Sequence, residues 1–329
     1  MFIPIIKAVM LPHGKFRDQG VSTMAQTTRR EFLSRSAATG AVIGFSGFSG
    51  HQIQAAEPLV KGPLVKGMPN ADKLGWRVGF SAYTFRALTL FETLDKIADV
   101  GLHFAELFAW QKLSPKHADA RPGPGLSKAL QCDLKKKAAD LGVRLVGCYT
   151  GLGSPDAAKK FFEFAADMEF EVIVSEPPEG VLDAIEKLTD EYKIDLALHN
   201  HPKPSSHYWN PETGLAALKG RSERMGFCCD TGHWCRSGLD PVETLKKVAS
   251  RVKTFHLKDL DAFGVPSAKD VIWGQGKGRI ADILAEVKRQ GIQHPYFGIE
   301  WERNLDEPIE THAKSAAFFE EVAGKLTTS

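Results

Sequence analysis

The sequence predicts an α/β fold, a (β/α)8 barrel (TIM barrel) built on a closed parallel sheet. From Arg77 onward, short apolar runs typical of strands alternate with amphipathic runs typical of helices. Such alternation implies parallel strands joined by helical crossovers, and eight strand–helix units in about 250 residues match this barrel. A doubly wound open sheet is the alternative. It normally carries a glycine-rich fingerprint after the first strand, and the Ser-Ala-Tyr-Thr-Phe of residues 81–85 is not one.

Each expected strand is a short apolar run, and several of the expected helices carry their own start or stop signal. The strands are expected at residues 78–83, 103–108, 143–148, 171–175, 194–199, 225–230, 253–258 and 296–301. The helices are expected at 90–100, from 126 to about 141, and at 155–168, 180–192, 211–218, 241–252, 279–290 and 308–325. Gly142 ends the second helix, Pro211 stands in a first turn, and Phe161, Phe162 and Ala165 line one helical stripe.

Length and composition place the chain among globular proteins with a sizeable core. Its 329 residues are enough for one large barrel or for two ordinary domains. The net charge of +2 implies no general electrostatic attraction to nucleic acid or to an anionic membrane. The five cysteines are too few and too irregularly spaced for a disulfide scaffold, so we expect free thiols.

The first 56 residues have the pattern of a leader segment. Arg29 and Arg30 are followed by Phe-Leu, a weakly apolar run and a zone of small residues, as in a twin-arginine signal peptide. Glycines interrupt the apolar run, which argues against a stable membrane anchor; a disordered tail is the alternative. We therefore expect export to the periplasm or another extracytoplasmic space. We also expect a natural start at Met24, a linker at 57–75 and the barrel domain at 76–329.

Residues able to bind a metal or a substrate stand at the ends of the expected strands. One strand ends on Asp230 and is followed at once by Thr-Gly-His233, which brings a carboxylate and an imidazole to the sheet edge. An Asp that only caps the next helix is the alternative. Barrels of this kind carry their chemistry at the strand ends. The residues at these ends are Glu106, Glu176, His199, Asp230, His256 and Glu300.

The alternation of side chains along each strand indicates that these groups point into the barrel. Alternate residues of a strand share a face, and each polar group shares its face with a small residue. The pairs are Ala197 with His199, Cys228 with Asp230, Thr254 with His256, and Gly298 with Glu300. Larger neighbours are expected to face the helices, namely Leu198, Phe227, Phe255 and Ile299. A narrow barrel with a ligand at its mouth needs this arrangement.

Two imidazoles and two carboxylates that converge on one point predict a metal site. Uncompensated buried charges are costly, and a divalent cation compensates them. The predicted ligands are His199, Asp230, His256 and Glu300. Their mixed nitrogen and oxygen donors suit one ion of Mn²⁺, Co²⁺, Zn²⁺ or Fe²⁺, with Mg²⁺ as a further candidate. Four protein ligands leave an octahedral ion open positions that adjacent substrate oxygens can fill.

These residues carry a resemblance to the sugar phosphate isomerase/epimerase family of xylose-isomerase-like TIM barrels. The matching motifs, within about residues 76–325, are Asp230-Thr-Gly-His233, His256-Leu-Lys-Asp259 and Gly298-Ile-Glu300. The family places one metal ligand on each of its last four strands, usually in the order Glu, Asp, His, Glu. The resemblance implies a divalent-metal-dependent isomerase or epimerase that acts on a sugar or keto-sugar through an enediolate.

The fifth strand departs from the family pattern, because His199 stands where the family usually has a glutamate. In the family's two-base mechanism, that glutamate also transfers a proton. Glu176 or Glu106 could take its place beside Glu300. We therefore expect catalytic roles for Glu176 and Glu300. Lys258 is a third expected catalytic residue that could hold a substrate oxygen or an enolate, with a plain salt bridge as the alternative.

Four residues are expected to contact the substrate: Glu106, His201, His233 and Trp301. Solvent-facing loop positions are the alternative for the two histidines, and a structural rim is the alternative for the tryptophan. The glycine-rich run 274–278 resembles a phosphate loop, but it lacks the preceding strand and the following Ser or Thr. We expect a mobile rim loop there.

Three rival functions remain open from the sequence. A lyase that acts by β-elimination on a 3-keto-glycoside uses the same enolate. An abasic-site endonuclease shares this barrel, but the near-neutral charge and the expected export argue against it. A non-catalytic metal- or sugar-binding protein is the third. The expected partner is a small sugar or glycoside, with no nucleic acid, and homo-oligomerisation is left open.

Overall fold

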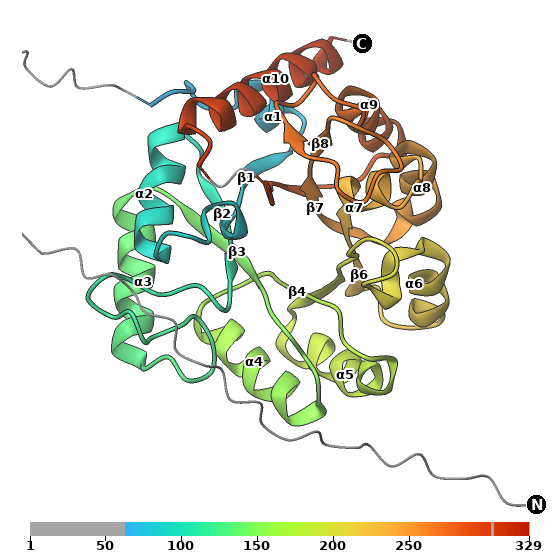
Figure 1. Ribbon diagram of the computed structural model, residues 1–329. Helices are drawn as coiled ribbons and strands as arrows, with labels where there is room; N and C mark the ends of the chain where they lie inside the picture. The colour runs from blue at the N-terminus through green and yellow to red at the C-terminus, as the bar shows by residue number, and fades with distance from the viewer. Residues whose placement is uncertain (1–62, 304–305, 329) are drawn as a thin grey trace, which may run out of the picture. The chain divides into compact units, whose positions relative to one another are not determined.

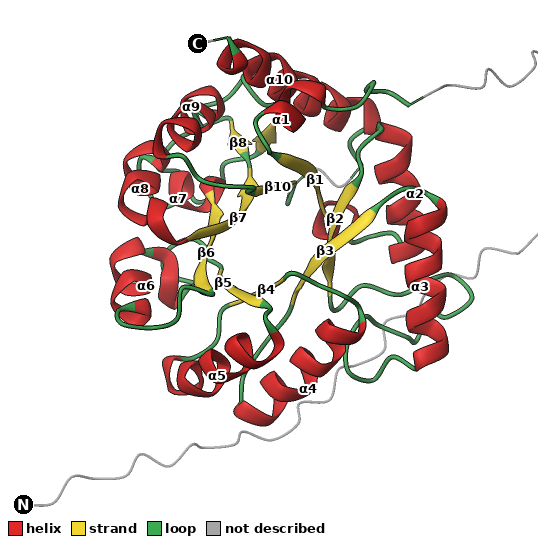
Figure 2. Cartoon of the chain, turned by 180° about the vertical axis from the view of Figure 1, so that it is seen from behind, coloured by secondary structure: helices red, strands yellow, loops and turns green. Residues whose placement is uncertain are grey.

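The described part of the chain forms a closed barrel of eight parallel strands in the order β1-β10-β7-β6-β5-β4-β3-β2. It comes from a computed structural model that describes residues 63–303 and 306–328. Helices surround the sheet on its outer side (Figures 1 and 2). The predicted (β/α)8 fold is confirmed, while the expected leader at 1–56 lies outside the described residues.

The barrel strands and the helices between them lie close to the positions expected from the sequence. The strands are β1 (Arg77–Ser81), β2 (Phe104–Phe108), β3 (Arg144–Tyr149), β4 (Val172–Ser175), β5 (Asp195–Leu198), β6 (Met225–Asp230), β7 (Val252–Leu257) and β10 (Tyr296–Ile299). The outer helices are α2 (Leu90–Val100), α3 (Lys128–Asp140), α4 (Pro155–Asp167), α5 (Leu182–Tyr192), α6 (Pro211–Leu218), α8 (Pro241–Val248), α9 (Ile280–Gln290) and α10 (Ile309–Thr327). Short 3-10 turns are η1 (Ala82–Phe85), η2 (Glu179–Val181), η3 (His207–Trp209) and η4 (Ala249–Arg251). None of the helices in the described ranges combines the length and apolar character needed to span a membrane.

Side-chain caps explain where several of these helices begin. At α2 the Thr89 hydroxyl accepts a hydrogen bond from the Glu92 N–H, and the Glu92 carboxylate accepts one from the Thr89 N–H. This reciprocal pair pins the first turn. Each cap satisfies an N–H group that the helix itself leaves unpaired. The other capping residues are Ser127 at α3, Ser154 at α4, Asn210 at α6 and Asp240 at α8.

Helix α1 (Pro69–Lys73) lies in the segment that was expected to be a linker (57–75). Two N–H groups of its first turn donate to the carboxylate of Glu320 in α10, at 2.6 and 3.1 Å. Ala71, in the middle of this helix, is fully buried. Proline and glycine suggested a linker, yet proline is favoured in the first turn of a helix. The described part of the expected linker is therefore folded, which differs from the expectation.

Two further elements were not expected from the sequence. Helix α7 (Thr231–Arg236) follows directly on β6, and all of its residues are buried. The loop after β7 contains an antiparallel pair of short strands, β8 (Asp259–Leu260) and β9 (Asp270–Val271). Both elements follow the carboxyl end of a barrel strand, so they build up the mouth of the barrel where the predicted site residues lie.

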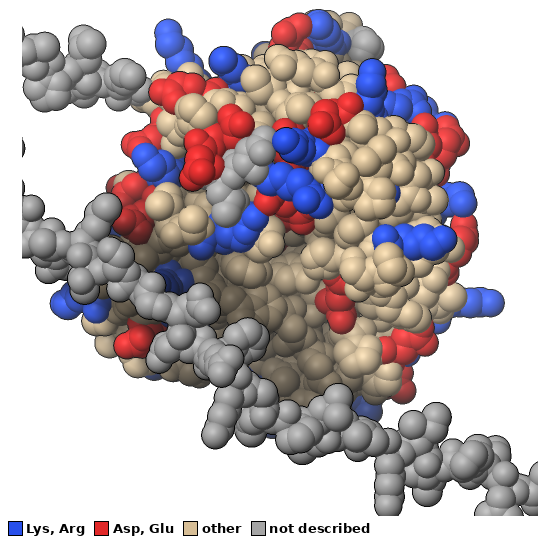
Figure 3. All heavy atoms as spheres, in the orientation of Figure 1, with Lys and Arg blue, Asp and Glu red and all other residues tan. Residues whose placement is uncertain are grey.

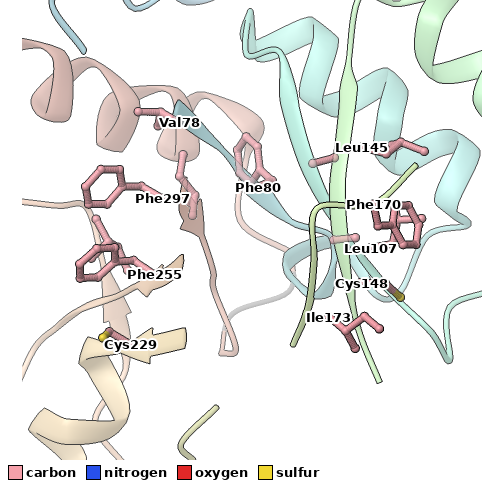
Figure 4. Packing of buried hydrophobic residues seen from close by; sticks show 14 of the residues in the cluster. Val78, Phe80, Leu107, Leu145, Cys148, Phe170, Ile173, Cys229, Phe255 and Phe297 are labelled. Atoms are coloured by element: carbon pink, nitrogen blue, oxygen red, sulfur yellow. The ribbon is translucent and has the colours of Figure 1, made fainter. Parts of the chain in front are cut away.

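Most of the buried apolar residues form two layers, one on each side of the sheet. The outer layer is bulky, and Figure 4 shows Phe255 and Phe297 within it, with ring centres 4.8 Å apart. The inner layer is small and consists of Val172, Val174, Ala197 and Cys228, with Tyr149 packed against them. The large neighbours that were expected to face the helices all belong to the outer layer: Leu198, Phe227, Phe255 and Ile299.

Candidate metal centre and active site

The carboxyl ends of four neighbouring strands bring the predicted metal ligands together. Asp230 ends β6 and His256 lies within β7, while His199 and Glu300 directly follow β5 and β10. One nitrogen or oxygen atom from each side chain lies within 4.8 Å of the other three. All four residues are buried. These four side chains therefore have the convergence that a single metal ion requires.

The two imidazoles are oriented by carboxylates on their outer sides. Nδ1 of His199 lies 3.1 Å from Glu176 Oε1, and Nε2 of His256 lies 2.8 Å from Glu106 Oε1. Their inner nitrogens, His199 Nε2 and His256 Nδ1, are buried and have no hydrogen-bond partner within the described residues. Metal-binding histidines commonly show this pattern, with the far nitrogen held by a carboxylate and the near one left for the ion.

The inner nitrogens face the carboxylates of the candidate ligand set. His199 Nε2 lies 3.4 Å from Asp230 Oδ2, and His256 Nδ1 lies 3.0 Å from Glu300 Oε2. These contacts do not have hydrogen-bond geometry, since both nitrogens remain unpartnered. Buried donors and acceptors are rarely left unsatisfied. A divalent ion between these four atoms would satisfy all of them, so the residues present fit such an ion.

Lys258 is the buried cation beside this set. Its Nζ contacts Asp230 Oδ2 and lies 2.6 Å from Glu300 Oε1. Burial lowers the pKa of Lys258, but the two carboxylates outweigh burial and raise it, so the side chain is an ammonium. With Glu106 and Glu176, four acidic side chains surround the centre. The positive groups beside them are the Lys258 ammonium and the protonated His199 imidazole, whose proton a divalent cation would replace.

Asp230 uses its two oxygens differently. Oδ1 accepts a hydrogen bond from the N–H of His233 at 2.8 Å and so caps helix α7. Oδ2 faces His199 and Lys258. Capping and metal binding were alternative interpretations of the sequence, and one side chain has the geometry for both.

The candidate ligands differ in how their pKa values respond to burial. Burial raises the pKa of Asp230 and of Glu300, but neighbouring imidazoles and the Lys258 ammonium hold both well below the usual range. Burial lowers the pKa of His199, yet the adjacent carboxylates of Asp230 and Glu176 raise it to about 10. The carboxylates are therefore ionised, and a cation would have to displace a proton from His199.

Glu176 connects two histidines that follow β5. Its Oε1 contacts Nδ1 of both His199 and His201, and its Oε2 accepts a hydrogen bond from Ser206. Burial raises the pKa of Glu176, but the hydrogen bonds from the two imidazoles lower it strongly overall. The His201 ring keeps its Nε2 without a hydrogen bond among the described residues. This arrangement fixes one nitrogen of His201 and leaves the other for a ligand.

A cavity of about 200 Å³ opens beside the ligand cluster. Its lining residues are Ser81, Tyr83, Phe108, Trp110, Tyr149, His199, His201, His256, Glu300 and Glu302. Figure 3 shows the surface hollowed near the middle of this view, with uncharged residues on the walls. The Tyr149 ring centre lies 5.2 Å from that of His199, so the aromatic wall adjoins the candidate ligands. A polar floor with an aromatic wall suits a small polyhydroxyl ligand.

Comparison with known proteins gives the family of the chain. A family model described as "Xylose isomerase-like TIM barrel" matches residues 178–322. A solved structure of a putative uncharacterized protein from Parabacteroides distasonis is 33% identical, with a TM-score of 0.62. The match covers 75% of this chain and 99% of that one. The chain belongs to the xylose isomerase-like TIM barrel family.

Other solved structures with a similar fold are more distant in sequence. A D-tagatose 3-epimerase-like protein is 18% identical, with a TM-score of 0.60, over 76% of this chain and 99% of that one. The IOLI protein, solved with a zinc atom, is 17% identical, with a TM-score of 0.62, over 76% and 98%. At these identities the likeness shows the fold alone. No match was found among curated proteins.

Apart from the candidate ligand Asp230, five of the residues predicted for the site of this xylose isomerase-like barrel do not line the cavity. Trp301 is buried with its ring centre 5.0 Å from that of His312, because it alternates with Glu300 and points outward. The others lie behind the lining, where they contact residues of the cluster: Glu106, Glu176, His233 and Lys258. His201 lies in the lining of the cavity.

Glu302 is a site residue that sequence reasoning missed. It lines the cavity, and its Oε1 lies 3.0 Å from His233 Nε2. Its Oε2 contacts the buried guanidinium of Arg236. Burial raises the pKa of Glu302, but Lys258 and His233 lower it strongly overall. Strand alternation could have found it, because Glu302 follows Glu300 by two residues.

The aromatic wall was also missed. Tyr83, Phe108 and Tyr149 stand at or just after the carboxyl ends of β1, β2 and β3, where TIM barrels carry their sites. Phe108 and Tyr149 have ring centres 6.1 Å apart, so the wall is continuous across two strands. These aromatic residues were not predicted, because the candidates were sought mainly among the charged residues and histidines at the strand ends. The same two-residue periodicity places Phe108 in line with Glu106.

The glycine-rich run 274–278 is organised by a carboxylate. The N–H groups of Gly274, Gly276 and Gly278 donate to Asp259 at 2.8, 3.0 and 2.7 Å. A Cβ at Gly276 would lie 2.4 Å from Asp259 Oδ1, so the close approach needs glycine. The donors that would hold a phosphate are occupied, and the loop is pinned to the end of β7.

Proposed function

We propose that this protein is a divalent-metal-dependent isomerase or epimerase that acts on a sugar or keto-sugar. The reaction moves a proton on a carbon beside a carbonyl group and passes through an enediolate. One observation carries the proposal: four buried candidate ligand atoms converge within 4.8 Å beside a cavity with an aromatic wall. The cavity of about 200 Å³ is smaller than sites for drug-sized ligands, which favours a group the size of one sugar ring.

The residues that would hold the ion are His199, Asp230, His256 and Glu300. Their donors suit Mn²⁺, Co²⁺, Zn²⁺, Fe²⁺ or Mg²⁺, and the zinc atom of the IOLI structure supports a metal in this fold. When bound, such an ion supplies a Lewis acid that lowers the pKa of a proton on the carbon beside a carbonyl.

We assign the proton transfer to His201, with Glu300 as the second group that can take up a proton. Both line the cavity. The contact of His201 Nδ1 with Glu176 fixes the ring and leaves Nε2 to accept the substrate proton. Glu176 was expected to be a base itself, but its oxygens are occupied by three hydrogen-bond partners. In this proposal Glu176 orients the two histidines.

A lyase that acts on a 3-keto-glycoside is the second candidate. In β-elimination, a base takes the proton beside the ketone, a carbon–carbon double bond forms, and the glycosidic C–O bond breaks. The leaving oxygen receives a proton as the alcohol departs. One observation favours this reaction: an open groove continues from the cavity past Trp110 and has room for a leaving group.

The experiment is proton NMR in D₂O, with the ion-loaded protein and a panel of aldoses, ketoses and 3-keto-glycosides. An isomerase or epimerase exchanges one carbon-bound proton and forms a stereoisomer or a positional isomer. A lyase releases the alcohol instead. Removal of the ion by a chelator should stop exchange, and its return should restore it. Exchange at the full rate in ion-free protein would contradict the proposal. No exchange with any compound would leave a non-catalytic binding protein.

A further inference from the structure

A second, larger hollow adjoins the cavity at the mouth of the barrel. This groove has a volume of about 880 Å³ and lies between the residues that follow β2 and those that follow β3. Loop 119–127 forms one wall, and the first turns of α4 form the other, including Ala157 and Lys160. The groove belongs to the same end of the barrel as the candidate metal centre.

Trp110 connects the two hollows, because its side chain lines both the cavity and the groove. It is 54% exposed, which is high for a tryptophan in a folded domain. Its ring centre lies 5.1 Å from that of Phe108 and 5.9 Å from that of Tyr149. The ring is therefore supported by the aromatic wall on one side and open on the other. An exposed, supported aromatic face beside a ligand cavity is a surface on which a flat-faced ring can stack.

The loop wall of the groove is held in shape by its own hydrogen bonds. The N–H of Leu113 donates to Ala120 O at 3.0 Å, and the N–H of Leu126 donates to Gly123 O at 2.9 Å. The Gln131 amide of α3 donates to Leu126 O at 2.9 Å. Prolines at 122 and 124 further restrict the backbone. A preformed wall lowers the entropy that a ligand must lose on binding.

The charges of the groove fit a neutral, hydroxyl-rich ligand. The cavity lining contains no Lys or Arg among the described residues. In the groove, Arg121 donates to the carbonyls of Ala118 and Ala120, and the lining holds one lysine, Lys160, beside two acids, Asp119 and Asp156. A phosphate group would need unpaired cations or free backbone donors. Mixed charges above an apolar floor instead suit hydroxyl groups on a ring.

We propose that the groove binds the second ring of a glycoside whose first ring occupies the cavity, with Trp110 stacking on that second ring. The substrate is then an unphosphorylated two-ring glycoside, either a disaccharide or an aryl glycoside, and a free monosaccharide is a poor ligand. This inference rests on the proposed function for the place of the first ring. The volumes agree with it, since a cavity of about 200 Å³ takes one ring and the groove takes another.

Calorimetric titration of the ion-loaded full-length chain tests the inference without any turnover. The probes are glucose, galactose and mannose, each as the free sugar, the β-phenyl glycoside and a β-linked disaccharide, with glucose 6-phosphate added. We expect at least one two-ring probe to bind about tenfold more tightly than its free sugar. Comparison of phenyl glycoside with disaccharide then identifies the chemistry of the second ring.

Three variants locate that preference in the groove. Trp110→Ala should remove most of the tenfold gain, and Trp110→Phe should keep part of it. Ala157→Trp, at an exposed position of the groove wall, should weaken the two-ring probe and leave the free sugar unchanged. Phe263→Ala is the matched control, because Phe263 is exposed but lines neither hollow. It should change no affinity.

Equal affinity for one-ring and two-ring probes would overturn the inference, as would tightest binding of glucose 6-phosphate or no binding of any probe. Trp110→Ala weakening free sugar and glycoside equally would also overturn it. The proposed function fails differently, through absence of proton exchange in D₂O. If the protein prefers glycosides in a way that depends on Trp110 but exchanges no substrate proton in D₂O, the inference about the groove stands and the isomerase proposal is rejected.

Discussion

Glu176 Oε1 lies 3.1 Å from His199 Nδ1, on the side of the imidazole away from Nε2, the nitrogen that faces Asp230. The same oxygen contacts Nδ1 of His201. One carboxylate therefore orients both a candidate metal ligand and the proposed proton acceptor. The sequence predicted Glu176 as a base; in the structure its carboxylate contacts two histidines.

Glu176→Gln should weaken both functions without removing either. An amide supports an imidazole less well than a carboxylate, and loss of such a partner typically costs about 10–100-fold in metal affinity or activity. The measurement is ion affinity by calorimetry together with kcat for proton exchange. Glu179→Gln is the control, because Glu179 makes a similar contact with His207 at 2.7 Å on the exposed surface. Equal effects of the two variants would contradict the orienting role.

His199→Glu should not by itself restore the glutamate that the family usually carries. A carboxylate at 199 would face Glu176 where the imidazole now lies, and two like charges in contact repel. We expect the single variant to lose ion affinity. The double variant His199→Glu with Glu176→Gln should recover much of it, since the second change removes the repulsion. Ion stoichiometry by mass spectrometry and calorimetry measures both. Recovery in the single variant would show that Glu176 does not constrain position 199.

Lys258→Met should destabilise the ion-free protein more than the ion-loaded protein. Removal of the ammonium leaves Asp230 and Glu300 as buried, uncompensated charges, and breaking such a contact costs about 3–5 kcal/mol. A bound divalent ion supplies the missing charge, so the loss should be smaller in its presence. Denaturant unfolding with and without the ion gives the comparison. The same loss of stability in both states would mean that the ion does not bind between these carboxylates.

His312 should give the fold a measurable acid sensitivity. Burial among Phe80, Phe85 and Trp301 lowers its pKa from 6.5 to about 4, because the charged form is disfavoured. A lowered pKa in the folded state leaves stability complete above pH 6.5 and reduces it as the pH falls towards 4. The reduction is about 3 kcal/mol. His312→Phe should flatten the stability profile between these pH values in denaturant unfolding. An unchanged slope would show that other groups cause it.

We also propose that the precursor is exported by the twin-arginine route, on the basis of Arg29-Arg30 and the glycine-broken apolar run that follows. Replacement of both arginines by lysine should keep the protein in the cytoplasm, because the export machinery recognises the arginine pair. Fractionation of cells that produce the full-length precursor measures this. Unchanged export of the lysine variant would reject the route.

Periodicity predicted the barrel well because strands and helices leave strong local patterns. The alternation that set Ala197 and Cys228 inside, with Leu198 and Phe227 outside, holds in the packed structure. The same alternation predicted that the ligand-type residues of four separate strands point to one place. Short elements were harder to predict. Helix α7 has only six residues, and all of them are buried. Its sequence therefore lacks the amphipathic pattern from which a helix is predicted.

The site was predicted less completely than the fold, because residue type does not reveal which neighbour a side chain meets. Glu176 and Glu106 looked like bases or substrate contacts, but each lies behind a histidine. Trp301 was expected to contact the substrate. Side chains alternate along the strand, so Trp301 points away from the barrel axis and is buried in the outer core. Trp110, on a loop after β2, carries no such periodic signal, and only the packed structure shows that it connects two hollows.

The double use of Asp230 restricts how this barrel can evolve. Oδ1 caps α7 and Oδ2 faces the candidate ion, so the side chain must be a carboxylate and must also be short. Glutamate coordinates metals equally well, yet its longer arm would lose the cap, and asparagine would keep the cap but lose the charge. His199 and His256 do not cap a helix. In a lineage that abandons the metal, the histidines would be free to change first, whereas position 230 would still need a short side chain that caps α7.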